Sequence, residues 1–398
     1  MQSPLAGMRV LDLTNVLAGP FCCHQLAHLG AEVIKVEVPG RGDLARQLGA
    51  DADLNRRNMG VSFLAQNAGK KSVTLNLKDR RGKDLLKRLV AGADVLVENY
   101  RPGVMDRLGV GFDVLKTVNP KLVYCAISGF GQDGPMKDLP AYDQIIQGVS
   151  GVMSITGDAE TAPYRVGYPL CDTIGGLTAA LSISAALAGP RSSATMIDVS
   201  MLEATLATMG WVVSNWLVAG VMPQANGNEN PTSAPSGLFL TADAPLNIAA
   251  NKQEQWEILC RHLGREELLT HPDYTLREDR KANRLALKAE LEKTLMTRPA
   301  RAWAEELNRL GVPAGEVMGV PDILEHPQIA DRGMLVHFDD VPGADRPATL
   351  VRTGFKLDGE APKVDRPPPR LGEDNEAIYG ALGLSTAELD ALKQEGVL

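Results

Sequence analysis

Residues 8–36 have the sequence MRVLDLTNVLAGPFCCHQLAHLGAEVIKV. Met8–Leu13 is a short apolar run typical of a buried parallel strand, and Glu32–Val36 is a second one. The segment between them, Pro20–Leu29, has a Gly-Pro start and a glycine stop, which predicts a helix. A strand, a helix and a strand within about thirty residues predict one βαβ unit at the start of the chain.

The same alternation continues beyond this unit. Further strands are expected at Val73–Leu77, Val95–Val97 and Leu122–Ile127, and an amphipathic helix at Arg80–Val90. Strands that alternate with helices predict a mainly parallel sheet covered by helices on both faces. The fold class is therefore α/β.

A chain of 398 residues is longer than one core usually holds, so two domains are expected. Gln224–Gly237 is rich in Asn, Pro, Ser and Gly and predicts a long loop between them. A strand at Leu246–Ala250 follows. Helices are then expected near Gln253–Leu263, Arg280–Thr294 and Ala300–Leu310.

These patterns divide the chain into three parts. Residues 1–223 are expected to form the first part of a large domain, residues 224–330 a small α+β domain, and residues 331–398 a return segment that completes the large domain. Within the return segment, the Pro-rich stretch Arg346–Arg370 is expected to cross back over the first domain. Ser385 and Glu388 form a capping-box pattern at the start of a last helix.

Composition excludes some classes of partner. The net charge is −8 and no Lys/Arg-rich run is present, so a nucleic-acid partner is not expected. Five cysteines, an odd number without CxxC pairs, predict reduced thiols and a cytoplasmic location. No secretory signal is apparent, and the apolar stretch Leu177–Leu187 is too short to span a bilayer, which predicts a buried helix and no membrane partner.

Asp172 is the candidate catalytic residue. It lies in the segment YPLCDTIGG, residues 168–176, where apolar residues precede it and a glycine pair follows. Such a segment favours a partly dry site that a large ligand approaches closely, and a carboxylate there can act as a covalent nucleophile. The alternative is an N-cap for a helix that begins near Thr173. The neighbouring Cys171 is interpreted as a small buried apolar residue.

Three glycine or histidine motifs lack a part that their usual function needs. Residues 129–134, GFGQDG, match GxGxxG but no helix follows, so NAD is not expected; Gly129 and Gly131 are instead expected in a ligand-binding loop at a strand end. Residues 24–28, HQLAH, have the spacing of HExxH without its glutamate, so no metal site is expected. Residues 68–72, AGKKS, lack the first P-loop glycine, although Lys71 remains a candidate phosphate contact.

Residues 98–103, ENYRPG, follow the strand expected at Val95–Val97. An amide, an aromatic ring and a guanidinium at a strand end suit an adenine nucleotide and its phosphates. An exposed polar turn is the alternative.

Together these segments resemble the class III CoA-transferases of the CaiB/BaiF type, also called the formyl-CoA transferase family. The resemblance covers nearly the whole chain, in order. It rests on residues 7–14, 16–20, 29–37, 67–73, 93–103, 128–131, 141–143, 172, 198–201 and 371–373.

The resemblance implies a Rossmann-like large domain built from both ends of the chain, a smaller domain between, and an interlocked-ring homodimer. It implies coenzyme A as the acyl-CoA substrate, with Asp172 as the nucleophile and Tyr142 near the thioester. CoA contacts are implied at Val16, Ala18, Lys71, Asn99, Tyr100 and Arg107.

The implied reaction moves CoA from an acyl-CoA donor to a carboxylic acid through an aspartyl anhydride and an aspartyl-CoA thioester. Formyl-CoA transferases proper carry Gln where this chain has Leu17 and His where it has Asn15, which argues against a formate/oxalate pair. A small dicarboxylate of the succinate type is expected instead, and Arg165 is a candidate for binding its second carboxylate.

Two alternatives remain. An α-methylacyl-CoA racemase of this fold uses a histidine at the position of Tyr142, and tyrosine is a poor base at neutral pH. A non-catalytic CoA-binding protein would not need Asp172.

Overall fold

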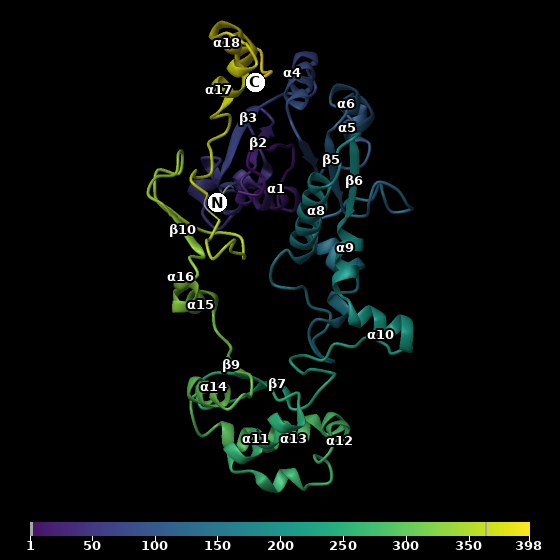
Figure 1. Ribbon diagram of the computed structural model, residues 1–398, viewed down its shortest axis with the longest axis vertical. Helices are drawn as coiled ribbons and strands as arrows, with labels where there is room; N and C mark the ends of the chain where they lie inside the picture. The colour runs from purple at the N-terminus through teal and green to yellow at the C-terminus, as the bar shows by residue number, and fades with distance from the viewer. Residues whose placement is uncertain (1–2, 363) are drawn as a thin grey trace. The chain divides into compact units, whose positions relative to one another are not determined.

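The computed structural model describes residues 3–362 and 364–398, which form two compact units (Figure 1). The first unit contains the described residues up to Gly151, together with Val166–Gly220 and Pro327–Leu398. The second contains Val152–Arg165 and Val221–His326. The large domain is thus built from both ends of the chain, as expected.

A six-stranded parallel sheet forms the centre of the first unit, with strand order β3-β2-β1-β4-β5-β6. This confirms the predicted α/β class. The strand order reverses between β1 and β4, and the carboxyl ends of strands at such a point open a crevice where ligands bind in open α/β sheets. The strands are β1 (Arg9–Asp12), β2 (Glu32–Glu37), β3 (Lys70–Thr74), β4 (Val95–Glu98), β5 (Val123–Ser128) and β6 (Thr195–Ser200).

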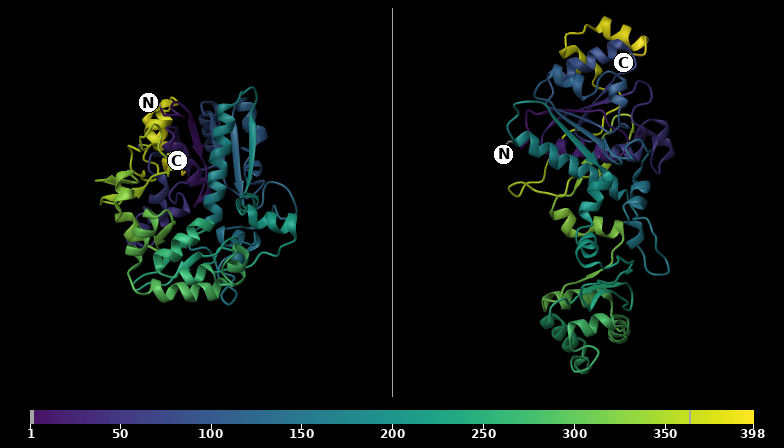
Figure 2. Two further views of the ribbon diagram at one scale, coloured as in Figure 1. Left: turned by 60° about the horizontal axis from the view of Figure 1, so that its bottom comes forward. Right: turned by 90° about the vertical axis from the view of Figure 1, so that its right-hand side faces the viewer.

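Helices cover both faces of this sheet (Figure 2). Because successive residues of a strand point to opposite faces, Val95 and Val97 of β4 pack on one side and Leu96 on the other. The first face is covered by α1 (Ala18–His28) and α8 (Leu170–Ala188). The second is covered by α4 (Arg80–Ala91), α6 (Phe112–Val118), α17 (Asn375–Ala381) and α18 (Thr386–Gln394). The first unit also contains η1 (Leu44–Gln47), α2 (Ala52–Arg56), α3 (Val61–Asn67), α5 (Val104–Arg107), α7 (Asp143–Val149), α9 (Met201–Thr208), α10 (Trp211–Ala219), α16 (Pro327–Asp331), β10 (Leu335–Phe338) and β11 (Ala348–Val351).

Helix α8 packs closely against α1 at Gly176. A Cβ atom built on Gly176 would lie only 2.5 Å from the carbonyl oxygen of Ala18 and 3.3 Å from the amide nitrogen of Cys22. Gly176 therefore lets the two helix backbones approach to a distance that a side chain would prevent. This contact holds the first turn of α8 beside the loop that precedes α1.

Helix α8 is longer than the predicted apolar stretch Leu177–Leu187. Its 19 residues are long and apolar enough to cross a membrane by length and composition alone, and 33% of the most apolar window is buried within this chain. Its neighbours are α1, α7, α9, β5 and β6, so in this structure it serves as a core helix of the first unit.

The return segment covers the free edge of β3. The amide of Gly69 donates to the carbonyl oxygen of Arg366 at 2.8 Å, and the amide of Ser72 donates to the Asp374 carboxylate at 2.9 Å. These bonds protect an edge that would otherwise expose unpaired backbone groups. Arg366, within the stretch 346–370 that was predicted to cross back over the first domain, thus bonds to that domain, and the capping box of Ser385 and Glu388 is confirmed.

One predicted strand is displaced along the chain. β3 spans Lys70–Thr74 rather than Val73–Leu77. Lys70 is completely buried, and its ammonium lies 2.9 Å from the Asp12 carboxylate. Lys70, which precedes the expected strand, is instead its first residue, because a buried carboxylate neutralises its charge.

The second unit is a small α+β assembly with an antiparallel sheet of β7 (Ser236–Phe239), β8 (Leu246–Ala249) and β9 (Ala314–Glu316). The predicted helix Arg280–Thr294 is two helices, separated at Asn283, whose side chain donates to the carbonyl oxygen of Asp279. The helices of this unit are η2 (Met153–Ile155), α11 (Gln253–Leu263), η3 (Glu266–Leu269), α12 (Arg277–Ala282), α13 (Arg284–Leu295), α14 (Ala300–Arg309) and α15 (Val320–Glu325).

The observed domain boundaries differ from the expected divisions 1–223, 224–330 and 331–398. Residues 152–165, expected in the large domain, belong to the second unit. The amide of Gly227 donates to the carbonyl oxygen of Gly157 at 2.7 Å, which joins this excursion to the start of the second unit. A segment as short as residues 152–165 has no distinct composition, so the sequence did not indicate that it belongs to the second unit.

The contact between α1 and α8 predicts that one added methyl group at Gly176 lowers the stability of the protein. Gly176→Ala is expected to lower the free energy of unfolding by about 1–3 kcal/mol, because the new Cβ overpacks against backbone atoms. Gly175→Ala is the matched control, since its Cβ would meet only the Met201 side chain at 2.9 Å. Chemical denaturation of both variants measures the difference, and equal stability would contradict the role assigned to Gly176.

Candidate functional site

A cavity of about 230 Å³ opens at the carboxyl ends of β1, β4 and β5, beside the point where the strand order reverses. Three strand-end loops and the first turn of α8 form its wall. The residues that line it are Asn15, Val16, Leu17, Ala18, Asn99, Tyr100, Arg101, Ile127, Ser128, Gly129, Pro140, Ala141, Tyr142, Asp172 and Met201.

Asp172 lies in the first turn of α8, which begins at Leu170 rather than near Thr173. The N-cap position is occupied by Pro169, which has no side chain to accept a hydrogen bond, so the N-cap interpretation of Asp172 is wrong. The carboxylate of Asp143 replaces the missing cap. Its Oδ1 accepts the amide of Cys171 at 2.8 Å and that of Asp172 at 3.4 Å.

This arrangement places two carboxyl groups close together at a partly buried position. Burial raises the pKa of Asp172 to about 7, and the negative charge of Asp143 contributes to the increase. Asp143 is itself buried, and its other oxygen accepts the side-chain amide of Gln147 at 2.7 Å. A carboxylate with such a pKa is more basic than an ordinary aspartate and is still available in ionised form near neutral pH.

Two asparagines join the strand ends on either side of the crevice. The amide of Asn15, after β1, donates to Oδ1 of Asn99, after β4, at 2.8 Å. The Nδ2 of Asn99 donates back to the carbonyl oxygen of Asn15 at 2.8 Å. This reciprocal pair fixes the distance between two walls of the cavity.

Six of the predicted ligand-contacting residues line the same cavity as Asp172. They are Val16, Ala18, Asn99, Tyr100, Gly129 and Tyr142. Tyr142 precedes α7 and is 67% exposed, so its side chain is available to a bound molecule. Residues that are separated by more than 150 positions in the sequence are thus brought together at one strand-end crevice.

The other four predicted residues do not line this cavity. The ammonium of Lys71 lies 2.6 Å from the carboxylate of Glu32, at the amino ends of the strands. Gly131 donates its amide to Ser128 Oγ at 2.9 Å, and Arg107 is exposed on α5. Arg165 is an exposed residue of the second unit.

The structure adds residues to which the sequence patterns gave no role, among them Ser128 and Met201 in the cavity wall and Asp143, which lies outside the wall beside the first turn of α8. Ser128 follows a correctly predicted strand, and its position at a strand end could have identified it. Met201 follows β6. This strand was not predicted, because its residues are neither alternately buried and exposed nor buried throughout, and so they give no regular apolar pattern in the sequence. Asp143 contacts α8 only through tertiary packing, so no local pattern reveals its function.

Among residues 3–362 and 364–398, no group of three or more His, Cys, Asp or Glu side chains is arranged to hold a metal ion. His24 and His28 lie within α1, and Nδ1 of His28 is 2.9 Å from the carbonyl oxygen of His24. Burial lowers the pKa of both imidazoles, which is typical of packed core histidines.

Comparison with known proteins gives a consistent result. The model of a family described as CoA-transferase family III matches residues 5–375. The chain is 39% identical to the acetyl-CoA:oxalate CoA-transferase of Acetobacter aceti, over 95% of each protein. It is 33% identical to the succinate–glutarate CoA-transferase of Agrobacterium fabrum, over 95% of this chain and 96% of that protein. The crystal structure of a CaiB/BaiF family protein from Brucella suis superposes with a TM-score of 0.84 at 33% identity, covering 96% of this chain and all of that one.

The raised pKa of Asp172 predicts a pH-dependent gain in stability when its charge is removed. The folded-state pKa of about 7 exceeds the ordinary value of 3.8, so ionisation above pH 4 destabilises the folded state until about pH 7. Asp172→Asn is therefore expected to raise the free energy of unfolding by up to about 4 kcal/mol at pH 8, with no gain below pH 4.

Thermal denaturation between pH 4 and 8 measures this effect. Asp133→Asn is the matched control, because it removes the same charge from an exposed position in a nearby loop. A gain for Asp172→Asn that does not change with pH would contradict the electrostatic explanation.

Proposed function

This chain belongs to CoA-transferase family III, and we propose that it moves CoA from an acyl-CoA donor to a carboxylic acid through the carboxylate of Asp172. One observation carries the assignment of the nucleophile. Asp172 is the carboxylate in the wall of the strand-end cavity, and burial together with Asp143 raises its pKa to about 7. Raised basicity and a partly dry environment both favour nucleophilic attack by a carboxylate.

The proposed reaction has four balanced steps. The Asp172 carboxylate attacks the acyl carbon of the donor, which forms a mixed anhydride and releases CoA thiolate. The thiolate attacks the aspartyl carbonyl, which forms an aspartyl-CoA thioester and releases the donor acid. The acceptor carboxylate attacks this thioester and forms a second anhydride. The released thiolate then attacks the acceptor acyl carbon, which gives the new acyl-CoA and restores Asp172.

The cavity supports this chemistry by its position and size. Water would hydrolyse an anhydride, so a carboxylate in a small, partly buried cavity protects the intermediates better than an exposed one. Asp143 holds the first turn of α8 through the amides of Cys171 and Asp172. It thereby orients the reacting carboxylate as well as raising its basicity.

We assign the CoA contacts to the cavity wall and its surroundings. Val16, Ala18, Asn99 and Tyr100 line the cavity with Asp172, which supports their assignment to the pantetheine and adenosine parts. Arg107, which is exposed on α5, is proposed to meet a phosphate group of CoA. Lys71 was implied as a further CoA contact, but its pairing with Glu32 at the amino ends of the strands does not support that assignment.

The proposed acceptor is a small dicarboxylic acid. The relatives act, by their names, on oxalate and glutarate, which are both dicarboxylates. The relative that uses oxalate keeps this acid among the candidates, although Leu17 and Asn15 argued against a formate/oxalate pair. Arg101 lines the cavity and Arg165 lies in the second unit, and each guanidinium is a candidate for the distal carboxylate.

Racemisation is less well supported than transfer. In the described part of the chain the cavity wall contains no histidine, and Tyr142 occupies the place of the racemase base. A protein that only binds CoA does not need a basic carboxylate at the site, so the raised pKa of Asp172 favours transfer over simple binding.

We also propose a cytoplasmic homodimer. The five cysteines are free and buried, which is consistent with a reducing compartment. Helix α10 supports the dimer, because within the described chain none of its residues is buried, although the sequence is WVVSNWLVA. Apolar side chains exposed in this way are typical of a protein interface, and an interlocked partner of the family type would cover them.

The proposed intermediate can be trapped. Incubation with an acyl-CoA followed by hydroxylamine is expected to convert Asp172 into a hydroxamate, which peptide mass spectrometry detects. Asp172→Asn is expected to lower kcat by about 10³-fold or more and to yield no adduct.

Other outcomes identify the alternatives. Exchange of deuterium at the α-carbon without an adduct would indicate a racemase, and neither exchange nor adduct would indicate simple binding. Asp133→Asn is the matched control, and wild-type turnover by Asp172→Asn would refute the proposed nucleophile.

Charge on α10 is expected to separate the subunits. Leu217 is 74% and Val218 is 87% exposed in the single chain, so the double variant Leu217→Glu, Val218→Glu would place two carboxylates in the proposed interface. Light scattering is expected to give twice 42.6 kDa for the wild type and a smaller mass for the variant. Leu285→Glu, at a 70% exposed position of α13, is the control that keeps the wild-type mass.

A further inference from the structure

Val16, in the cavity wall, has an unfavourable backbone conformation. Its φ angle is +67°, in the left-handed region that β-branched residues rarely adopt. It lies next to Asn15, which is held by Asn99, and just before the first turn of α1. A conformation of this kind persists only when surrounding bonds enforce it.

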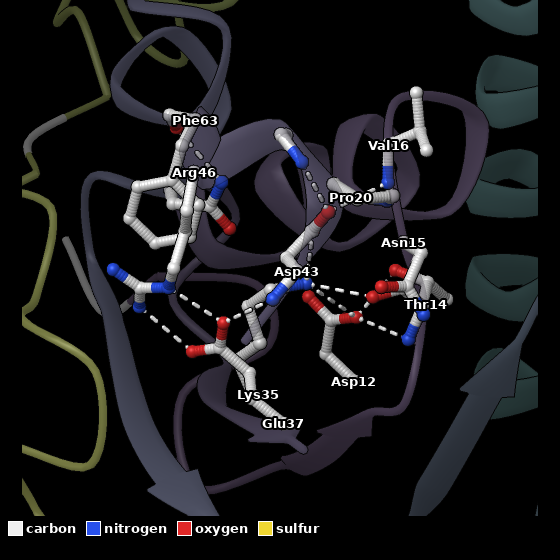
Figure 3. Close-up of polar contacts among 12 residues, drawn as sticks. Asp12, Thr14, Asn15, Val16, Pro20, Lys35, Glu37, Asp43, Arg46 and Phe63 are labelled. Atoms are coloured by element: carbon white, nitrogen blue, oxygen red, sulfur yellow. Dashed lines mark hydrogen bonds and ion pairs between the residues drawn. The ribbon is translucent and has the colours of Figure 1, made fainter. Parts of the chain in front are cut away.

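The bond that meets Val16 comes from a buried carboxylate. The amide of Val16 donates to Oδ1 of Asp43 at 2.9 Å, and Asp43 is only 1% exposed (Figure 3). The same oxygen accepts the amide of Ala45 at 2.9 Å, and the amide of Asp43 donates to Glu37 at 2.9 Å. Bonds to both the backbone and the side chain of Asp43 therefore fix the position of the oxygen that accepts the Val16 amide.

A buried lysine holds Asp43 and the same loop together. Nζ of Lys35 lies 2.9 Å from Oδ2 of Asp43 and donates to the carbonyl oxygen of Thr14 at 2.8 Å. Lys35 is completely buried, as is Asp12, which accepts both the amide and the hydroxyl of Thr14. The residues before and after Asn15 are thus anchored to one charged cluster (Figure 3).

The second lysine extends this anchor to the start of α1. Nζ of Lys70 donates to Oδ2 of Asp12 and to the carbonyl oxygen of Pro20, both at 2.9 Å. Burial opposes the charge of Asp43, but Lys35 together with the amides of Val16 and Ala45 outweighs it and lowers the pKa of that carboxyl. Asp12 and Asp43 have lowered pKa values and Lys35 a raised one, so these three groups act as a fixed support rather than a pH switch.

We propose that Asp43 is a positioning residue for CoA transfer, which holds Val16 in the left-handed conformation and so sets one part of the cavity wall that also contains Asp172. The inference rests on the proposed function of this cavity. Asp43 does not line the cavity and acts only through the amide of Val16. Its function is distinct from simple stabilisation, because it fixes one backbone angle at the site.

A double-mutant cycle separates the two functions. Asp43→Ala is expected to lower kcat/KM for the acyl-CoA at least about tenfold and to weaken binding of free CoA, measured by calorimetry. In the Val16→Gly background the same change is expected to cost less than about threefold, because glycine adopts a positive φ without help. Asp43→Asn, which keeps the accepting oxygen, is expected to lose stability but retain most activity.

The control is Arg280→Met. It removes buried hydrogen bonds to the carbonyl oxygens of Ala234 at 2.9 Å and Tyr274 at 3.0 Å within the second unit, away from Asp43 and Glu37. This variant is expected to lose stability in chemical denaturation while kcat/KM, per folded molecule, stays within about twofold.

Equal losses from Asp43→Ala in the two backgrounds would overturn the positioning role. The binding measurement decides the question even if the chain proves to lack transferase turnover, because it needs no reaction. Failure to trap an adduct at Asp172, with the cycle behaving as expected, would refute the nucleophile and leave the function of Asp43 in place. If Asp43→Ala does not fold, Asp43→Asn and Asp43→Glu replace it, and loss of activity by Asp43→Asn equal to that of Asp43→Glu would contradict the proposal.

Discussion

The close approach of α8 to α1 at Gly176 is the constraint on which the site depends. Because no side chain separates the helices, the first turn of α8 reaches the crevice between β1 and β4. The loop that leads into α1 forms another part of the wall of the same crevice. One pair of packed helices therefore determines where the reacting carboxylate and the ligand-binding backbone lie relative to one another.

Buried charge serves two different purposes in this unit. At the site, Asp143 and Asp172 are like charges, and their proximity together with burial makes Asp172 more basic at a cost in stability. Near the site, Asp12 and Asp43 are paired with Lys35 and Lys70, so electrostatic attraction compensates for the cost of burying these charges. The same cluster holds the loop around Val16 in an unfavourable backbone conformation. The first arrangement provides reactivity, and the second provides the rigid frame that reactivity needs.

The sequence predicted what depends on local patterns. The βαβ unit of residues 8–36 and the capping box at Ser385 follow from periodicity and capping, and both are present. The start of α8 was misplaced because its cap, Asp143, comes from another helix. The strand β3 was displaced because the partner that permits burial of Lys70 is Asp12, which is distant in sequence. Long-range pairing of this kind leaves no mark in a local window.

The same limit applies to the candidate site. Asp172 stood out through its apolar and glycine-rich surroundings, and six further residues predicted from the family resemblance or from a strand-end motif line the same cavity. Lys71 was also predicted as a ligand contact, but it does not line the cavity, because its side chain is paired with Glu32 at the amino ends of the strands. Which end of a strand a residue occupies depends on the strand boundary, and that boundary was fixed by a tertiary ion pair.

The return segment along the β3 edge has a consequence for synthesis. Arg366 and Asp374 bond to this strand, and Tyr379 donates its hydroxyl to the carbonyl oxygen of Thr74 at 2.9 Å. The six strands of the central sheet lie within residues 9–200, so they are synthesised before the residues that cover the β3 edge, and the inserted second unit also emerges earlier. An unfinished polypeptide therefore has an open β3 edge, and termination of synthesis before Arg366 would leave that edge uncovered.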